Sequence, residues 1–151
     1  MSENETSIED SLPMQLRHVY LTMHRVAQAH FSSYSATADQ FVLLSLLQEE
    51  DGITQTELGQ KMATDANTVT AMLKVLENRD WIQRERCKQD GRARRVYLKS
   101  KGKKLAEKML SGSEILREAI EEAIPVGQRE QFQACLLNII QTVQQYEEKQ
   151  H

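Results

Sequence analysis

The sequence predicts a mainly α-helical fold in a single domain. Its 151 residues suit one domain with one core, since domains commonly hold roughly 100–200 residues. Glycine (6) and proline (2) are scarce and aromatic residues form only 5% of the chain, whereas Leu, Gln, Glu, Lys and Ala are abundant, which favours helices over many short strands. Hydrophobic residues at 40% and charged residues at 27% are typical of a globular protein and exclude a disordered acidic chain.

The composition also predicts where the protein works. The most apolar stretch, Phe41 to Leu47, is far shorter than the roughly 20 residues that a bilayer-spanning helix needs. The N-terminus carries Glu3, Glu5, Glu9 and Asp10 and no early Lys or Arg, unlike a secretory signal. We therefore expect a cytoplasmic protein with no membrane partner.

Helical spacing of apolar residues predicts two helices in the first third of the chain. The first runs from about Leu12 to about Ser33, with Pro13 in its first turn. The second runs from near Ala38 to Glu50, and its apolar residues are dense enough for burial on most sides. Asp51-Gly52 ends it.

Two shorter helices follow, separated by a turn. Thr54 stands three residues before Glu57, a capping box that begins a helix through about Met62. Thr64-Asp65 then begins a helix from about Ala66 to Asn78, and the pair forms a helix-turn-helix pattern. The face of the second helix opposite its apolar side carries Asn67, Thr70, Ala71, Lys74 and Asn78.

Beyond Asp80 the hydrophobic period changes from about 3.6 toward 2. Ile82, Val96 and Leu98 can form one inward face of two strands. The pair Asp90-Gly91 between the strands favours a tight hairpin turn. The sequence therefore predicts a β-hairpin with a basic tip, the wing of a winged helix.

The C-terminal part returns to helical spacing beyond Gly102, with Gly112 as a candidate interruption and Pro125-Val126-Gly127 as a break. A last helix runs from about Gln128 to about Glu148. Cys135 lies on its apolar side, and we expect it to be a core residue. Long terminal helices with apolar stripes need a partner surface, so we expect a homodimer built from both termini. The stripe of the last helix consists of Phe132, Leu136, Ile139, Ile140, Val143 and Tyr146.

Charge is unevenly distributed along the chain. The segment from Thr54 to Lys104 holds 13 Lys and Arg against 6 Asp and Glu, a local charge of +7, while the remainder carries −10. This is the footprint expected when one face approaches a phosphate backbone. The alternative interpretation is a solvated charged surface.

The order of these elements, together with Asp90 to Leu98 (DGRARRVYL) and the following Lys101-Gly102, resembles the multiple-antibiotic-resistance regulator (MarR) family of bacterial transcription factors. The resemblance covers nearly the whole chain. It implies a winged-helix homodimer that binds a pseudo-palindromic operator, usually as a repressor. In many members small ligands or oxidation tune the affinity.

Carried onto this chain, the resemblance implies one domain over residues 1–151. Residues 36–99 would form the winged helix-turn-helix DNA-binding lobe, and residues 10–35 and 100–150 would be mainly dimerisation helices. Ala66 to Asn78 would be the recognition helix and Ile82 to Leu98 the wing.

Individual residues of the wing also follow from the resemblance. Arg92 would reach the minor groove of DNA, and Asp90 would hold the shape of the wing. Lys99 departs from the family, in which Thr often caps the next helix, and we expect Ser100 to take over the cap.

The start of the predicted recognition helix carries groups that can read base edges. Asn67 can pair bidentately with adenine, and Thr68 and Thr70 offer a hydroxyl to a base or phosphate and a methyl to thymine. The alternative is that both threonines are ordinary exposed helix residues. The full predicted DNA-contacting set is Thr54, Gln55, Asn67, Thr68, Thr70, Ala71, Lys74, Arg84, Arg86, Lys88, Asp90, Arg92, Arg94 and Arg95.

The cations in this set differ in their expected partners. Arg92 and Arg94 flank the hairpin tip, and a narrow, negative minor groove attracts guanidinium groups. The alternative is that an exposed arginine keeps the hairpin edge soluble. Phosphate is the expected partner of Lys74, Arg84, Arg86, Lys88 and Arg95, and of Thr54 and Gln55 at a helix N-terminus, although Thr54 can serve as a cap alone.

A ligand cleft between the dimer helices and the DNA-binding lobe is implied only by the resemblance. It makes His18, Tyr20, His24 and Tyr34 candidate binding residues for a small-molecule effector. Successive histidines at 18, 24 and 30 are turned by roughly 240° around a helix, so they cannot share one metal on a single face. No zinc-type spacing is present, and we expect no metal and no cofactor.

Cys87 lies among Arg84, Arg86 and Lys88, and a cationic environment can lower the pKa of a thiol. A redox switch in the wing is therefore one hypothesis, and an idle buried thiol is the other. The peroxide-sensing branch of the family uses a cysteine near the start of the first long helix, where this chain has none.

The sequence argues against an enzyme, since it has no Gly-rich phosphate loop, no Gly-x-Ser-x-Gly elbow and no His-Glu-x-x-His motif, and we expect no catalytic residues. The predicted function is a sequence-specific, DNA-binding transcriptional repressor. The alternative is a winged-helix module that binds proteins without specific DNA binding, because a fold does not dictate a function.

Overall fold

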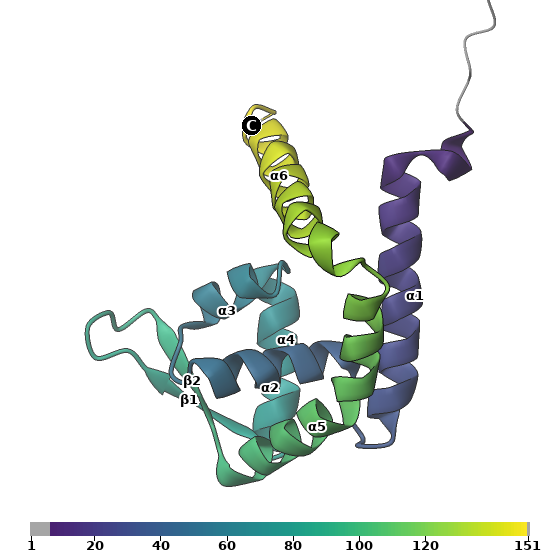
Figure 1. The fold of residues 1–151 in the computed structure, drawn as a ribbon. Coiled ribbons are helices and arrows are strands. Elements are labelled where there is room, and N and C mark those ends of the chain that lie inside the picture. Colours follow the sequence, from purple (N-terminus) through teal and green to yellow (C-terminus); the bar gives the residue numbers. More distant parts are fainter. Residues whose placement is uncertain (1–6, 151) are drawn as a thin grey trace, which may run out of the picture. The chain divides into compact units, whose positions relative to one another are not determined.

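A computed structural model describes residues 7–150, and the acidic Glu3 and Glu5 of the expected N-terminus lie outside the described residues. The described chain is mainly helical with one two-stranded sheet, as predicted (Figure 1). It divides into two compact units, one ending at Gly112 and one beginning at Ser113. In the described part of the chain, no helix combines the length and apolar character that crossing a bilayer requires.

The first two predicted helices are confirmed. A short 3-10 turn, η1 (Ile8–Asp10), precedes α1 (Leu12–Ser32), and α2 (Ala38–Glu49) follows. Thr37 begins α2 with a capping box, in which its hydroxyl accepts from the N–H of Gln40 at 3.1 Å. Three leucines of α2 are fully buried, as expected for a helix dense in apolar residues: Leu43, Leu44 and Leu47.

The helix-turn-helix is also confirmed. It consists of α3 (Gln55–Lys61) and α4 (Ala66–Asn78), and both N-termini carry the predicted side-chain caps. Burial of Leu58 in α3 and of Leu73 and Leu76 in α4 fixes the two helices on a shared core. The face of α4 opposite these leucines is exposed.

The predicted wing forms from β1 (Ile82–Arg86) and β2 (Arg94–Leu98), which pair antiparallel with Ile82 opposite Leu98. Ile82 and Val96 are buried, so the predicted inward face is confirmed.

A tight turn that contains Asp90 and Gly91 forms as predicted, but it does not join the strands directly, because the loop between them spans residues 87–93. Its tip is a turn in which the N–H of Ala93 donates to the carbonyl of Asp90 at 3.1 Å, which centres the turn on Gly91 and Arg92. The Asp90 carboxylate accepts from the N–H of Arg92 at 3.0 Å, and this local bond stabilises the turn.

The loop before α3 fastens the wing to the helices. Val96 of β2 accepts from the N–H of Gly52 and donates to the carbonyl of Ile53, both at 2.9 Å. Gly52 has φ +79°, and a β-carbon there would come within 2.7 Å of the Tyr97 ring. The wing is therefore held at its base by the segment that leads into α3.

The helix after the wing is α5 (Ser100–Glu122), and it runs through Gly112 without the interruption considered from the sequence. Ser100 is its first residue, so the expectation that Ser100 caps it is wrong. Lys99 precedes the helix and accepts at its carbonyl from the N–H of Lys103 at 2.9 Å. The N–H of Lys99 donates to the carbonyl of Trp81 at 2.9 Å, which fixes the chain at this point.

Unit 2 contains the end of α5, a 3-10 turn η2 (Val126–Gln128) at the predicted Pro125 break, and α6 (Arg129–Glu148). No residue of α6 is buried in the single chain, and its apolar residues include exposed Phe132, Ile140, Val143 and Tyr146. Cys135 is exposed, so its placement as a core residue is wrong for the single chain.

Gly102→Ala is predicted to destabilise the fold, because a β-carbon at Gly102 would overlap the carbonyl oxygen of Trp81 and lie 2.8 Å from its carbonyl carbon. The free energy of unfolding should fall by about 3 kcal/mol, as for an overpacked core site. Urea titration at fixed protein concentration measures this. Gly91→Ala is the control, since nothing lies within 4 Å of a β-carbon there. Equal stability of the two variants would contradict the packing described.

Candidate nucleic-acid interface

A groove of about 530 Å³ opens between the start of α3, the side of α4 and the wing. Six of the residues that line it were predicted from the sequence to contact DNA: Thr54, Gln55, Thr70, Arg84, Arg92 and Arg94. Thr56 and Ala93, which the sequence analysis did not single out, complete the lining. Three arginines thus meet the N-terminus of a helix in one concave surface, an arrangement suited to an anionic backbone.

Thr54 caps the N-terminus of α3, and its side chain is hydrogen-bonded within the cap. Its hydroxyl accepts from the N–H of Glu57 at 3.2 Å and donates to the Glu57 carboxylate at 2.9 Å. The same carboxylate oxygen accepts from the N–H of Thr54 at 2.8 Å. These bonds favour capping as the role of the Thr54 side chain. Gln55 differs, because its side-chain oxygen is buried without a hydrogen-bond partner.

The two threonines at the start of α4 use their hydroxyl hydrogens within the helix. Thr68 donates to the carboxylate of Asp65 at 2.7 Å, and Thr70 donates to the carbonyl of Ala66 at 2.8 Å. The lone pairs and methyl groups of these threonines remain for a partner, whereas a phosphate oxygen needs a donated hydrogen. The hydroxyl groups of Thr68 and Thr70 can therefore accept a hydrogen bond from a base, but they have no hydrogen left to donate to a phosphate.

The outer face of α4 is polar and exposed, as predicted. Asn67, Ala71 and Lys74 are exposed on it, while Val69 and Leu73 on the opposite face are buried. A helix held by its apolar face on a core, with short polar residues outward, can enter a major groove about 12 Å wide.

The register of the hairpin divides the basic residues of the wing between its two faces. Because side chains alternate along a strand, Arg84, Arg86 and Arg94 share one face with the buried Val96. Arg86 lies directly opposite Arg94. Like charges in such a pair destabilise a hairpin, and a bound anion would relieve the repulsion.

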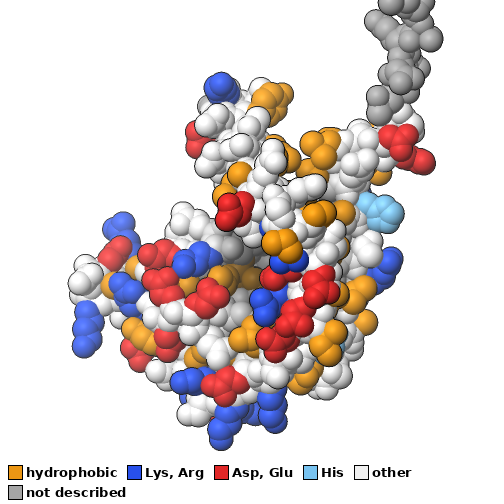
Figure 2. All heavy atoms as spheres, in the orientation of Figure 1, with side chains coloured by type: hydrophobic (Ala, Val, Ile, Leu, Met, Phe, Trp, Pro, Cys, Tyr) orange, Lys and Arg blue, Asp and Glu red, His pale blue; other side chains and the backbone are white. Residues whose placement is uncertain are grey.

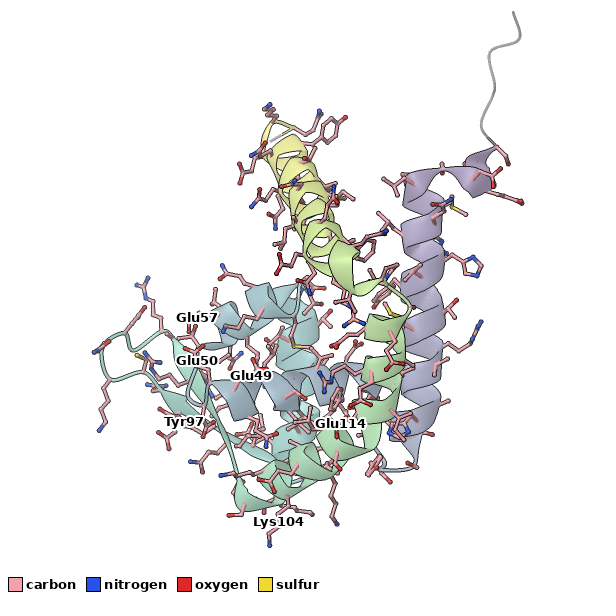
Figure 3. All side chains as sticks on the ribbon, in the orientation of Figure 1. Glu49, Glu50, Glu57, Tyr97, Lys104 and Glu114 are labelled. Carbon is pink, nitrogen blue, oxygen red and sulfur yellow. The ribbon has the colours of Figure 1, made fainter. Side chains whose placement is uncertain are left out.

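Arg95 lies on the other face, and it makes a contact within the fold that the sequence did not predict. Its guanidinium donates to the carbonyl of Gly52 at 2.7 Å and is half-buried. Tyr97, next on this face, packs beside Gly52 (Figure 3). Arg95 therefore binds the wing to the loop before α3 and does not line the groove.

The exposed tip of the wing carries Lys88, Asp90 and Arg92. The bond from the Arg92 N–H to the Asp90 carboxylate matches the shape-holding role that the resemblance implies for Asp90. Arg92 thus projects from a turn that a neighbouring side chain braces.

Cys87 lies at the base of the wing loop and is buried. The N–H groups of Asp90 and Gln89, together with the Arg95 guanidinium, hold the pKa of its thiol below the ordinary value. The sequence predicted this direction of the pKa change, but from the neighbouring Arg84, Arg86 and Lys88. Arg95 is the cation concerned.

Acidic residues gather beside the base of the wing. Glu50 accepts from the Lys61 ammonium at 2.8 Å, and Glu50, Glu49 and Glu57 together raise the pKa of that lysine (Figure 3). Figure 2 shows blue side chains on the wing at the left edge and red side chains beside its base. On this side of the molecule, basic side chains therefore lie on the wing and acidic ones beside its base.

The four candidate ligand-binding residues do not meet in one cavity of unit 1. Tyr20 stacks on His24 with ring centroids 5.6 Å apart, and His18 lines shallow hollows on α1. Tyr34 follows the far end of α1, about 20 Å along the helix from Tyr20, and contacts His30. Across residues 7–150, no group of three or more side chains suited to holding a metal ion is present.

The fold and this groove define a winged helix-turn-helix protein. Residues 36–93 match the model of the MarR family. The transcriptional regulator TtmR of Methylorubrum extorquens is 33% identical over 113 residues, which cover 72% of this chain and 58% of TtmR. The regulator MgrA of Staphylococcus aureus is 28% identical over 99 residues, covering 61% of this chain and 67% of MgrA. The chain thus spans little more than half the length of TtmR.

Solved structures share the fold. The S. aureus MepR–DNA complex has a TM-score of 0.79 at 23% identity, covering 88% of this chain and 98% of MepR. The transcriptional regulator SlyA has a TM-score of 0.82 at 18% identity, covering 93% of this chain and 99% of SlyA. Residues 36–93 of this chain thus belong to the MarR family.

The caps at the groove predict a pH dependence of stability. Hydrogen bonds from Thr54 lower the pKa of Glu57 below 4.5, and hydrogen bonds from Thr68 lower the pKa of Asp65 below 3.8. A carboxyl group with a depressed folded pKa stabilises the fold above its unfolded pKa, and this stability is lost as pH falls through the folded pKa. The free energy of unfolding should therefore decline below about pH 4.5.

Asp65→Asn should flatten part of this decline, because Asn caps a helix without titrating. Urea titrations between pH 7 and pH 3 measure it, with the exposed Glu118→Gln as the control. A decline in Asp65→Asn as steep as in the wild type would contradict the assignment.

Proposed function

We propose that this protein is a sequence-specific, DNA-binding transcriptional regulator that acts as a homodimer and represses from a pseudo-palindromic operator. The observation that carries the proposal is the groove in which Arg84, Arg92 and Arg94 meet the start of α3 beside the exposed face of α4. The relatives described as transcriptional regulators, and the fold shared with a DNA-bound protein, support it.

In this proposal α4 enters the major groove, with Asn67 reading a base edge and Lys74 on phosphate. Arg92 at the tip of the wing enters the adjacent minor groove, whose negative potential attracts a guanidinium. Arg86 and Arg94 meet the phosphates between them, which would relieve their repulsion across the strands.

The homodimer is proposed from the apolar side chains that the single chain leaves exposed at both ends. Val19, Tyr20 and Val26 in α1, and Ile140 and Val143 in α6, are each at least 45% exposed. A two-fold dimer would bury them and present two recognition helices to half-sites about 34 Å apart. A dimer bound to such an operator would block transcription. Binding of a small effector would release the dimer from DNA. The protein would act in the cytoplasm.

Arg92→Ala should weaken binding to DNA by more than about tenfold and make the dependence on salt shallower, since it removes a minor-groove cation from each protomer. Asn67→Ala should weaken binding and relax sequence preference. Fluorescence anisotropy across a salt series measures both, on a duplex selected by the wild type and on a scrambled duplex. Lys61→Ala is the control, because carboxylates surround Lys61 away from the groove.

Unchanged affinity in both variants would refute this docking mode. Wild-type binding that depends neither on sequence nor on salt would favour the alternative, a winged helix that binds proteins.

Val143→Glu should convert the protein to a monomer, because it places a charge in the proposed dimer surface, where Val143 is 60% exposed in the single chain. Sedimentation velocity measures the mass. Val42→Glu, at a 41% exposed position of α2, is the control and should leave the dimer intact. A wild type that sediments as a monomer, or a Val143→Glu variant that stays dimeric, would rule out this interface.

A further inference from the structure

One ion pair in unit 1 differs from the others in its burial. Arg84 of β1 donates from Nε and Nη2 to one carboxylate oxygen of Glu77 in α4, at 2.9 and 2.6 Å. The Arg84 side chain is only 15% exposed, whereas the cation of each other ion pair among the described residues is at least 40% exposed. A pair this sheltered is screened less by water and salt than a surface pair.

The pair joins the two elements that the proposed function brings to DNA. Glu77 lies in the last turn of α4, and Arg84 lies at the centre of β1, opposite the buried Val96. Arg84 also lines the groove with Thr70 of α4 and Arg92 of the wing. Arg84 therefore contacts α4 and also lines the groove that is proposed to bind DNA.

The chemistry of the guanidinium allows both contacts. It carries five N–H donors in a rigid planar fork, and Glu77 uses two of them. The remaining donors are available for a phosphate oxygen in the groove. A lysine in the same place has one terminal ammonium and would serve only one of the two partners well.

Charge alone does not account for Glu77. A carboxylate beside a groove that binds phosphate cancels one of its cations and repels the ligand, so simple electrostatics would favour a neutral residue there. An acidic residue at this place is useful if it fixes the direction of the arginine and the distance between helix and wing.

We propose that Glu77 is a positioning residue, which holds the Arg84 guanidinium on the groove wall and locks the wing to α4. The recognition helix and Arg92 then contact the major and minor grooves in one fixed register. This inference rests on the proposed function. It assigns to the Glu77–Arg84 pair the preference for one DNA sequence over another, beyond general attraction to phosphate.

The proposal and simple electrostatics predict opposite results for Glu77→Gln. The substitution removes the negative charge and keeps Arg84, so electrostatics alone predicts tighter binding to every duplex. The positioning role predicts that affinity for the selected duplex falls about tenfold, as for the loss of one coupled pair, while affinity for a scrambled duplex is unchanged or rises. The measured quantity is the ratio of the two affinities.

The experiment uses the full chain and the duplex that the wild type selects from a random pool, with a scrambled duplex of equal composition. Glu85→Gln is the matched control, because it removes the same charge from the opposite face of the same strand. Arg84→Lys should lower the ratio as Glu77→Gln does, and the double variant should lose little more than either single one. Thermal unfolding at fixed concentration checks that each variant is folded.

A Glu77→Gln variant that is folded and keeps the wild-type ratio, or that binds both duplexes more tightly by the same factor, would overturn the proposal and leave the proposed function standing. A loss of preference in Glu85→Gln as large as in Glu77→Gln would also overturn it. A wild type that selects no duplex from the pool would overturn the proposed function and this inference together.

Discussion

The position of the wing depends on one residue of β2, Val96, whose backbone is hydrogen-bonded to the loop before α3. Val96 is fully buried, gives its backbone N–H and carbonyl to the loop before α3, and lies opposite Arg84 of β1. Two backbone bonds at 2.9 Å therefore tie the wing to the start of the helix-turn-helix. Arg95 repeats the connection from the other face through the Gly52 carbonyl. Without this anchor, Arg92 would have no fixed distance from α4.

Some charged side chains of unit 1 repel each other in the protein without a bound anion, which lowers the stability of the fold. Arg86 faces Arg94 across the hairpin, a pair that repels until an anion lies between them. On another side of the lobe, Glu49, Glu50 and Glu57 surround Lys61 and compensate its charge. Arg92 and Arg94 line the groove with no ion pair among the described residues, whereas Arg84 is paired with Glu77 and Lys61 with Glu50. A chain with a net charge of −3 can therefore carry a locally basic surface.

The sequence predicted those features that depend on neighbours along the chain. The capping box at Thr54 and the polar face of α4 follow from spacings of three and four residues, and both agree with the structure. The turn at Asp90-Gly91 forms as predicted, but the length of the loop around it depends on where the two strands stop pairing, which the local sequence does not show. The contacts of Arg95 and Glu77 were missed because their partners depend on strand register, and Gly52 is 43 residues from Arg95.

The most direct test of the account is hydrogen–deuterium exchange of the free protein and of the protein with its selected duplex. We expect protection of amides at the start of α3, at the start of α4 and in the wing loop, residues 54–56, 66–71 and 88–93, with less protection by a scrambled duplex. Protection confined to α1 and α6, or the same protection by both duplexes, would contradict a sequence-reading groove between the recognition helix and the wing.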